Sequence, residues 1–475
     1  MSERSNPPLS FAFSAAVLAA VTLLSGCVNL IPAYQRPVAP IASAYAPEMT
    51  PADAAGGVAA ADVEWQRFFA DERLKRLIEA ALQNNRDLRI AVLNIEQARA
   101  TYQIRRADEL PSVGAGVTVQ RQAAGNGKLA NIYAVGLALS SYEVDFFGRI
   151  RSLSQAALAQ YLGTAEARKT VQISLVSTVA NAYLSLLADE ELLRVTRQAL
   201  ATREDSTKLT KLKFDYGAAS ELDYRQAESL LEGAKVTLAQ SLRQRALDED
   251  QVVLLIGQPL PAELPEPMAL NGQQVTTELP AGLPSDLLER RPDIRAAEQQ
   301  LMAANANIGA ARAAFFPRIS LTANFGSAST QLTGLFKSGS FAFTGAGQLL
   351  EAIFDAGRNQ AGLELATVNR DIATAQYERA IQTAFREVSE ALAGRATLGE
   401  QLRAQLAQAN AEEVRYRLSD LRYRNGASSY LEVLDAQRSL FLAQQAVVQV
   451  QAAQVQNLVT LYRVLGGGWK EAAPG

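Results

Sequence analysis

The segment from Gly148 to Gly217 gives the strongest indication of the fold, and it reads GRIRSLSQAALAQYLGTAEARKTVQISLVSTVANAYLSLLADEELLRVTRQALATREDSTKLTKLKFDYG. It contains no proline, and Gly163 is the only glycine between its two ends. At 1.5 Å per residue, about 68 residues make a helix of roughly 100 Å. Glycine commonly ends a helix, and Ser220 stands where it would cap the next one. We therefore expect a long rod that turns back at Gly217.

The chain contains this rod twice. The segment from Gly357 to Gly426 repeats it at an offset of 426−217=209, with Ser429 in the place of Ser220. Earlier parts of the chain repeat at an offset of 206, as Pro111 and Pro317 do, so the duplication carries one three-residue insertion. We divide the chain into a first repeat at 65–258, a Pro-rich connector at 259–284, a second repeat at 285–466 and a tail at 467–475.

Further helices flank each rod. We expect one before it, from Asp71 to Ala107 and again from about Asp293 to Ala314. A shorter helix should return after it, from Glu221 to Ile256 and from Tyr430 to Leu465. Apolar residues recur every seven positions, which predicts coiled-coil packing. These residues are Val179, Leu186, Leu193 and Leu200 on the first rod, and Leu434, Phe441, Val448, Val455 and Tyr462 on the second return helix.

Each repeat also has two segments in which apolar residues alternate with small or polar ones, the pattern of a β-strand. They cover 112–120, 134–140, 319–326 and the residues from Phe341. Each is about the 9 to 11 residues that a tilted strand needs to cross a membrane. The alternation by itself fits a soluble sandwich equally well. If the strands do cross a membrane, we expect these residues to face lipid: Val117, Val119, Leu137 and Leu321.

Four strands cannot close a barrel, because the smallest closed barrels use about eight. An open sheet edge cannot face lipid, so a membrane-spanning form of this chain must oligomerise. The strands and the turns at Gly217 and Gly426 should lie at opposite ends of the rod, about 100 Å apart. That distance suits a protein that crosses a periplasm.

The N-terminus has the features of an export signal at 1–26, with Arg4 followed by a short apolar run. The run ends in Leu24-Ser25-Gly26-Cys27, which resembles the lipobox at which bacteria attach diacylglycerol to cysteine. We therefore interpret Cys27 as the lipid attachment site and 27–64 as an acylated linker. A chance cysteine after an uncleaved anchor is the alternative. Val28 is not the aspartate that retains bacterial lipoproteins at the inner membrane, so we expect the outer membrane.

The composition excludes several classes of function. The chain has no histidine, and Cys27 is its only cysteine. Catalysis by Ser-His-Asp or Cys-His, imidazole metal sites and internal disulfides therefore have no residues to build them. The net charge of −3, without a basic run, argues against nucleic-acid binding. We expect no enzyme activity, no cofactor and no metal.

Four groups of residues carry a family resemblance: Cys27 to Leu30 with Pro32, Tyr34, Arg36 and Pro37; Trp65 to Ala91; Ser141 to Arg149; and Gly282 to Arg295. Phe354 to Arg358 and Tyr423 to Ala436 extend it into the second half. They resemble the outer-membrane factors of tripartite efflux pumps, similar to TolC and especially to the OprM and NodT lipoproteins. Ala352 departs from the proline that many relatives carry.

The resemblance implies a mixed α+β membrane protein. Three tandem-duplicated protomers would form a twelve-stranded β-barrel in the outer membrane, continuous with a twelve-helix α-barrel in the periplasm. The resemblance further implies that this homotrimer is a passive exit duct for drugs or other small molecules. Its partners would be a periplasmic adaptor, an inner-membrane pump of the RND type and outer-membrane lipid.

The resemblance also implies a closed periplasmic mouth. Glu432 and Asp435 lie three residues apart, on one helix face. In the family, acids at these positions ring the mouth, and a tyrosine matching Tyr423 bonds an acid matching Asp223. A solvated helix face is the alternative. The hairpin tips, with the expected adaptor contact, are Gly217, Ser220, Gly426 and Ser429. Ser428 stands where TolC-like members carry an arginine, so the latch should be weaker or built differently.

Two other functions compete with this interpretation. A periplasmic adaptor lipoprotein would also be acylated and rich in coiled coil, but it would lack four membrane-length strands in a duplicated chain. A lipid-anchored cell-wall hydrolase would need catalytic groups, and the sequence has neither histidine nor a paired-carboxylate signature.

Overall fold

The computed structural model describes residues 28–46, 58–123, 129–273, 280 and 284–470. Cys27 and the expected signal at 1–26 lie outside the described residues. The chain divides into two compact units. Unit 1 holds the described residues up to Val38 with Asn94–Thr164 and Ala296–Tyr377, and unit 2 holds Ala39–Leu93, Ala165–Arg295 and the described residues from Glu378.

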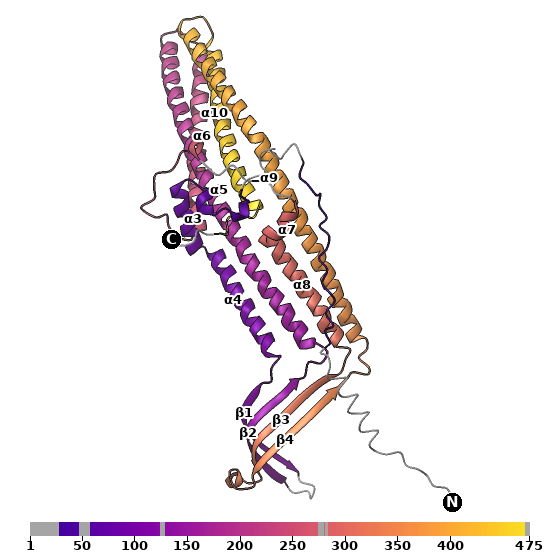
Figure 1. Cartoon of the computed structure of the whole chain (residues 1–475). Helices are drawn as coiled ribbons and strands as arrows, with labels where there is room; N and C mark the ends of the chain where they lie inside the picture. Colours follow the sequence, from indigo (N-terminus) through magenta and orange to yellow (C-terminus); the bar gives the residue numbers. More distant parts are fainter. Residues whose placement is uncertain (1–27, 47–57, 124–128, 274–279, 281–283, 471–475) are drawn as a thin grey trace, which may run out of the picture. The chain divides into compact units, whose positions relative to one another are not determined.

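The elements follow one order in each repeat (Figure 1). The first repeat runs through η3 Ala60–Asp62, α2 Trp65–Phe68, α3 Glu72–Asn84, α4 Arg86–Ala107, β1 Val113–Ala123, β2 Leu129–Glu143, α5 Arg149–Asp215 and α6 Glu221–Ile256. After η4 Leu270–Gly272 and η5 Pro284–Asp286, the second runs through α7 Leu287–Arg290, α8 Pro292–Ala313, β3 Arg318–Ser329, η6 Leu332–Gly334, β4 Phe341–Leu350, α9 Arg358–Arg424 and α10 Tyr430–Val464. The two rods and both return helices are confirmed within a residue or two.

One expected helix is wrong. The segment from Asp71 to Ala107 is broken at Asn85, whose backbone is extended, so that α3 and α4 are separate. The Asn85 side chain accepts a hydrogen bond from the Leu88 amide at 3.0 Å and donates to the Leu255 carbonyl at 2.9 Å. It therefore caps α4 and ties this break to the end of α6. Two consecutive asparagines, Asn84 and Asn85, were the signal, because asparagine favours helix caps over helix interiors.

Unit 1 contains a four-stranded antiparallel sheet in the order β1-β2-β3-β4. The hairpin of each repeat is confirmed, and β2 pairs with β3 to join the two hairpins. Gly136 pairs with Gly326 at this junction, where either Cβ would collide with the opposite backbone. The outer edges of β1 and β4 have no partner within the described chain. The sheet is thus an open ribbon.

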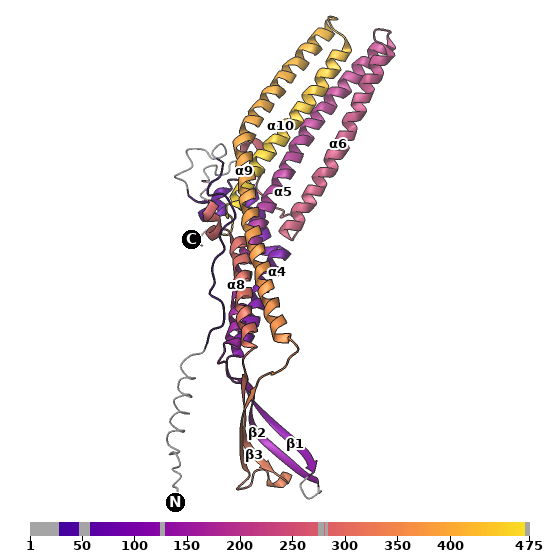
Figure 2. The same cartoon turned by 90° about the vertical axis from the view of Figure 1, so that its right-hand side faces the viewer.

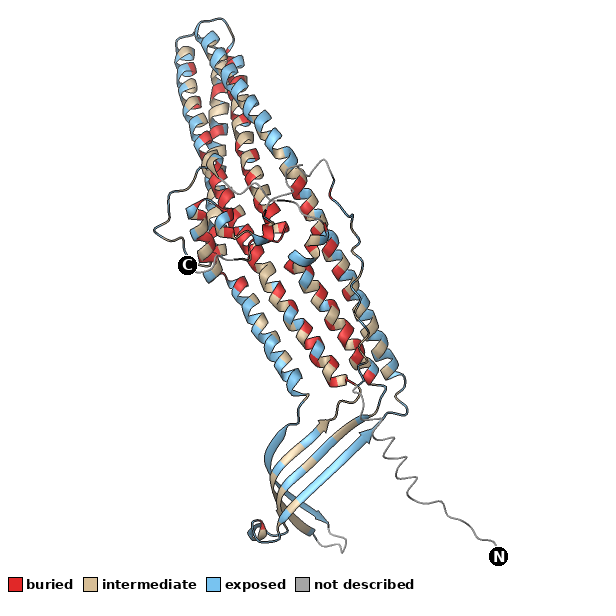
Figure 3. Ribbon diagram, in the orientation of Figure 1, coloured by how far each residue is buried: buried red, intermediate tan, exposed pale blue. Residues whose placement is uncertain are grey.

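The register places apolar and small or polar residues on opposite faces of this sheet. Leu137 pairs with Ala115 and Phe325, and Phe325 pairs with Phe343. The neighbouring row on the other face joins Ala138, Gly114, Asn324 and Thr344. No residue of the four strands is buried within the protomer, and Figure 3 shows them as intermediate or exposed. No described part of the protomer covers this apolar face, so we expect another molecule to cover it.

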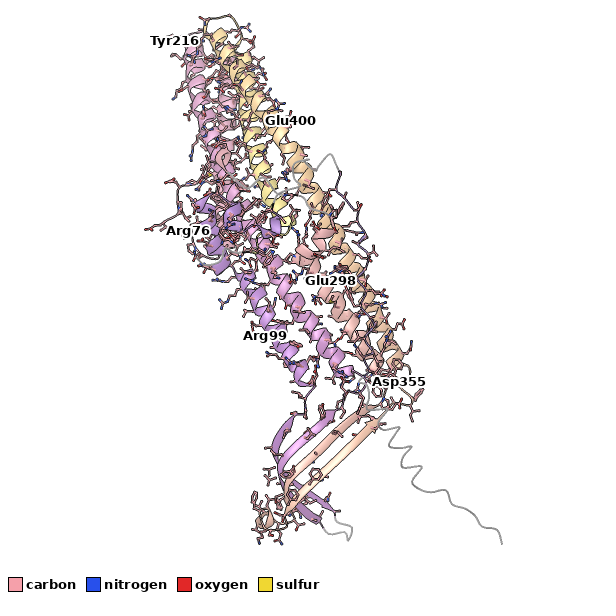
Figure 4. The ribbon with its side chains drawn as sticks, in the orientation of Figure 1. Arg76, Arg99, Tyr216, Glu298, Asp355 and Glu400 are labelled. Carbon is pink, nitrogen blue, oxygen red and sulfur yellow. The ribbon has the colours of Figure 1, made fainter. Side chains whose placement is uncertain are left out.

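An aspartate caps the start of each long helix in both repeats. Asp145 accepts a hydrogen bond from the Arg151 amide at 2.9 Å. Asp355, marked in Figure 4, accepts from the amides of Gly357 and Asn359, both at 2.9 Å. A carboxylate at a helix N-terminus satisfies free N–H groups and opposes the helix dipole.

An N-terminal strap lies along α8 in unit 1. Glu298, marked in Figure 4, accepts hydrogen bonds from two nitrogens of the Arg36 guanidinium at 2.7 and 2.8 Å. It also accepts one from the Tyr34 hydroxyl at 3.0 Å. Burial and the adjoining Glu298 carboxylate raise the pKa of Tyr34. The strap is also held at its beginning, because the Val28 amide donates to the Phe146 carbonyl at 3.1 Å.

The core of unit 2 is built by the rods and return helices, with α9, α10, α5 and α6 side by side (Figure 2). The expected seven-residue stripes are confirmed: all the named positions are buried except Leu200, which is half-buried. Part of α5 is long and apolar enough to cross a membrane, but 67% of that window is buried in the protein. Its composition is accounted for by core packing. Tyr462 stacks on Phe68 at 4.0 Å and so fixes α2 against α10.

Candidate functional site: the tips of the helical hairpins

The two hairpin turns in unit 2 are built alike. Gly217 and Gly426 have φ values of 72° and 69°, a backbone that favours glycine. The amide of Ala218 donates to the Lys213 carbonyl at 2.7 Å, and the amide of Ala427 donates to the Arg422 carbonyl at 2.8 Å. These bonds close a Schellman motif at the end of each rod. Tyr216, beside the first turn, is 82% exposed (Figure 4).

The caps after the two turns differ. Ser220 accepts a hydrogen bond from the Asp223 amide at 3.1 Å, and Asp223 accepts from the Ser220 amide at 3.2 Å. This capping box confirms the role predicted for Ser220. Ser429 occupies the same position before α10, but its side chain makes no capping bond. Ser429 is thus the N-cap residue of α10, as predicted, but the expected side-chain cap is wrong. Glu432 at the third helical position lies beside Arg422 and does not complete a capping box.

Glu432 and Asp435 both pair with arginines of the same protomer. Arg415 on α9 donates to the Asp435 carboxylate, and Arg438 donates to its other oxygen at 2.8 Å. Arg422 on α9 lies 3.6 Å from the Glu432 carboxylate. The Arg415 guanidinium, with Arg438, holds the pKa of Asp435 below its usual value. The negative charges of Glu432 and Asp435 are thus balanced by arginines of the same protomer.

The partners of these acids, Arg415 and Arg422, are not among the predicted site residues, although their spacing gives a signal. Arg415 lies 426−415=11 residues before the turn glycine and Asp435 lies 435−426=9 residues after it. In a helical hairpin, residues at similar distances from the turn lie opposite each other. Arg422 also donates to the Ala427 carbonyl at 3.3 Å. The cation at this turn therefore comes from a residue that precedes Gly426. Ser428, after the glycine, contributes only a shielded hydroxyl without a hydrogen-bond partner among the described residues.

The ring of Tyr423 makes the contacts that fix its position. The ring lies 5.1 Å from that of Tyr430, and the Lys213 ammonium lies 4.1 Å from its centroid. It packs against a buried cluster of Ala227, Tyr430, Val433 and Leu434, which joins both hairpins. The Asp223 carboxylate bonds to Ser220 and not to the Tyr423 hydroxyl. The expected Tyr423–Asp223 bond is therefore not formed within this protomer.

The tip combines ion pairs with aromatic packing. Its ion pairs link α9 to α10, while aromatic contacts link the α5–α6 hairpin to the α9–α10 hairpin. Exposed ion pairs of this kind contribute about 0 to 1 kcal/mol each, so they can exchange partners readily. Among the residues that the structure describes, no group of three or more Asp, Glu, His or Cys is arranged to hold a metal.

Comparison with known proteins agrees with this architecture. The model of the family described as outer membrane efflux protein matches residues 77–258 and 283–467, one segment for each repeat. The chain is 46% identical over 458 residues to the probable efflux pump outer membrane protein TtgC of Pseudomonas putida, covering 94% of each chain. It is 44% identical over 463 residues to the outer membrane protein OprJ of Pseudomonas aeruginosa, covering 96% of each.

A solved structure is similar over the same length. The open state of the MtrE outer membrane channel of Neisseria gonorrhoeae matches with a TM-score of 0.86 and 39% sequence identity. The match covers 94% of this chain and 100% of that one. The similarity therefore extends over nearly the whole chain.

Proposed function

Because this chain belongs to the outer membrane efflux protein family, we propose that it is the passive exit duct of a tripartite, RND-type efflux system that carries drugs or other small molecules out of the cell. The family is one of outer-membrane channels, and the chain has their fold. One observation carries the proposal: a four-stranded sheet with an apolar face and two open edges is attached to a duplicated pair of long helical hairpins. A periplasmic adaptor, the competing interpretation, would lack such a sheet.

The open edges support a homotrimer. With four antiparallel strands per protomer, β4 of one protomer can pair with β1 of the next while the antiparallel order continues around the ring. Three protomers give a barrel of twelve strands, an even number as in other outer-membrane barrels. α5, α6, α9 and α10 of three protomers supply the twelve helices of the tube. The division of the chain at 65–258, 259–284 and 285–466 is part of this proposal.

Lipid attachment at Cys27 is supported by the position of the next residue. Val28 is bonded to Phe146, shortly after the end of β2, so the start of the described chain lies beside the segment that leaves the sheet. An acyl group there would be at the membrane edge. Mass spectrometry of the N-terminal peptide should show a thioether-linked diacylglycerol on Cys27. An intact Met1 terminus would contradict this assignment.

The tips are the proposed adaptor contact and gate. Gly217, Ser220, Gly426 and Ser429 are all exposed, and the adjoining Tyr216 offers an apolar contact surface. The ion pairs of Asp435 and Glu432 would hold each α9–α10 hairpin in its closed shape. Tyr423 and Asp223 of adjacent protomers would then be free to bond across the interface. On this basis Tyr423→Phe should raise the open fraction of the channel.

The test combines assembly with conductance. The purified, lipidated protein should run as a trimer after cross-linking and should conduct ions in a planar bilayer. It should also restore drug resistance to a strain that lacks its own outer-membrane efflux channel. A monomer without conductance would refute the duct. Conductance without restored resistance would leave the channel standing and contradict its place in a tripartite drug-efflux system.

A further inference from the structure

A cavity of about 150 Å³ lies within unit 2, between α5, α9 and α10. Its walls include Arg203 from α5, Glu413 and Tyr416 from α9, and Gln437 and Phe441 from α10. None of these residues takes part in the ion pairs of Asp435 and Glu432. The cavity is therefore separate from the ion pairs at the tip.

The unusual group in this cavity is the guanidinium of Arg203. The residue is only 7% exposed. One nitrogen donates to the Leu230 carbonyl at 3.3 Å, and the guanidinium carbon lies 5.0 Å from the centroid of the Phe441 ring. No carboxylate lies within ion-pair distance of it among the described residues. Burial lowers the pKa of Arg203, and no acidic group opposes that effect.

A buried cation without a counter-ion is costly, because the penalty for removing a charge from water reaches several kcal/mol. A guanidinium also has five N–H donors, and a single long bond to a carbonyl leaves most of them unused. The contact with the Phe441 ring offsets part of the cost. The remaining donors are available to a ligand with paired acceptor oxygens.

Gln437 and Tyr416 add a second polar wall. Gln437 is 7% exposed, and its amide donates to the Ser206 hydroxyl at 3.1 Å and to the Tyr416 hydroxyl at 3.4 Å. Its carbonyl oxygen is buried without a hydrogen-bond partner among the described residues, and as an acceptor it does not bind an anion. Because the Tyr416 oxygen accepts from Gln437, its own proton is left to donate. Glu413 also lines the cavity, but this residue is exposed, so solvent screens its repulsion of an anion.

We propose that this cavity binds a small organic anion with one carboxylate and a ring-sized apolar body. A guanidinium fork holds a carboxylate through two parallel hydrogen bonds. The Phe441 and Leu440 side chains supply an apolar wall for the body of the ligand. The size is suitable, since an apolar cavity of about 150 Å³ is enough to take up benzene. The bound anion would connect α5 to α10.

The test uses the purified full-length protein in a non-ionic detergent, with sodium benzoate as the probe and benzamide as its neutral match. Isothermal titration should show binding of benzoate at least about tenfold tighter than that of benzamide, because only benzoate pairs with the guanidinium. Arg203→Gln should weaken benzoate binding by a similar factor. Arg194→Gln removes the same charge from an exposed ion pair on α5 and should leave binding unchanged.

Two further variants keep the test decisive if Arg203→Gln does not fold. Arg203→Lys retains the charge but loses the fork, so it should bind benzoate more weakly than the unchanged protein. Phe441→Leu should weaken benzoate while the preference over benzamide remains. Equal affinity for benzoate and benzamide would overturn the proposal, as would unchanged benzoate binding in a folded Arg203 variant.

Discussion

Replacing Gly136 with alanine should separate the two halves of the sheet. Gly136 lies on β2 opposite Gly326 on β3, in the only pairing that joins the hairpins of the two repeats within the described chain. An added Cβ would collide with the Phe325 carbonyl and would lie 2.7 Å from the Gly326 Cα. Ordinary contacts begin at 3.4 Å, so the strands must move apart by at least 3.4−2.7=0.7 Å.

The cost follows from this displacement. The colliding atoms are backbone, which has no alternative rotamer, so β2 and β3 must separate locally. An N–H···O bond of ordinary length is largely lost after such a movement. Overpacking costs about 1–3 kcal/mol, and each of two lost ladder bonds about 0.5–1.5 kcal/mol. We therefore expect Gly136→Ala to destabilise the folded protein by roughly 2–6 kcal/mol.

The measurement is denaturant unfolding of the reconstituted protein, together with the yield of trimer on semi-native gels. Gly116→Ala is the matched control, because Gly116 pairs with Gly136 on the same face but its added Cβ meets nothing within 4 Å. The control should unfold close to the unchanged protein. If Gly136→Ala and Gly116→Ala unfold at the same denaturant concentration, the close approach of β2 and β3 does not limit the sheet, and the reasoning fails.

Three other predictions concern the sheet face, the tip and the helical core. Leu137→Arg should lower trimer yield more than Ala138→Arg, because a cation on the lipid face costs about 2–4 kcal/mol at mid-membrane; equal yields would reverse the orientation of the sheet. Glu432→Ala with Asp435→Ala should shift the reversal potential in planar bilayers towards anion preference, since their arginine partners remain; an unchanged potential would place the gate elsewhere. Burial and a neighbouring carboxylate raise the pKa of Asp189 to about 7, so the protein should gain stability as the pH falls from 8 to 5.5. Asp189→Asn should flatten this dependence of the melting temperature, and an equally steep dependence in the variant would contradict it.

The sign of the last prediction follows from proton binding. Between the ordinary pKa of an aspartate and about 7, the folded protein holds a proton at Asp189 that the unfolded chain has released. Lowering the pH therefore favours the folded state until the unfolded chain also takes up the proton. The Asp248 carboxylate raises this pKa, and Arg245 opposes the shift. Glu190 and Glu249, both beside Arg245, should moderate that opposition.

Local patterns were sufficient to predict the long helices. Gly217 and Gly426 end the rods because a left-handed residue closes a helix within a few positions, and such a signal needs no tertiary context. The alternation around Leu137 likewise assigned each strand residue to a face, since the two faces of a strand follow directly from its period of two. Asn85 shows the limit, because its cap depends partly on a carbonyl of α6, far away in the sequence.

The duplication, the order of helices and strands, and the family resemblance could all be predicted from the sequence, because they depend on residues close together in the chain or at a constant offset. Which charges lie close together, and which are buried, depends on how the helices pack. Arg415 pairs with Asp435, Arg422 lies beside Glu432, and Arg203 is buried without a carboxylate partner among the described residues. The energy of a charge depends on its distance to other charges and on its exposure to water, and both quantities are set when separate helices pack together.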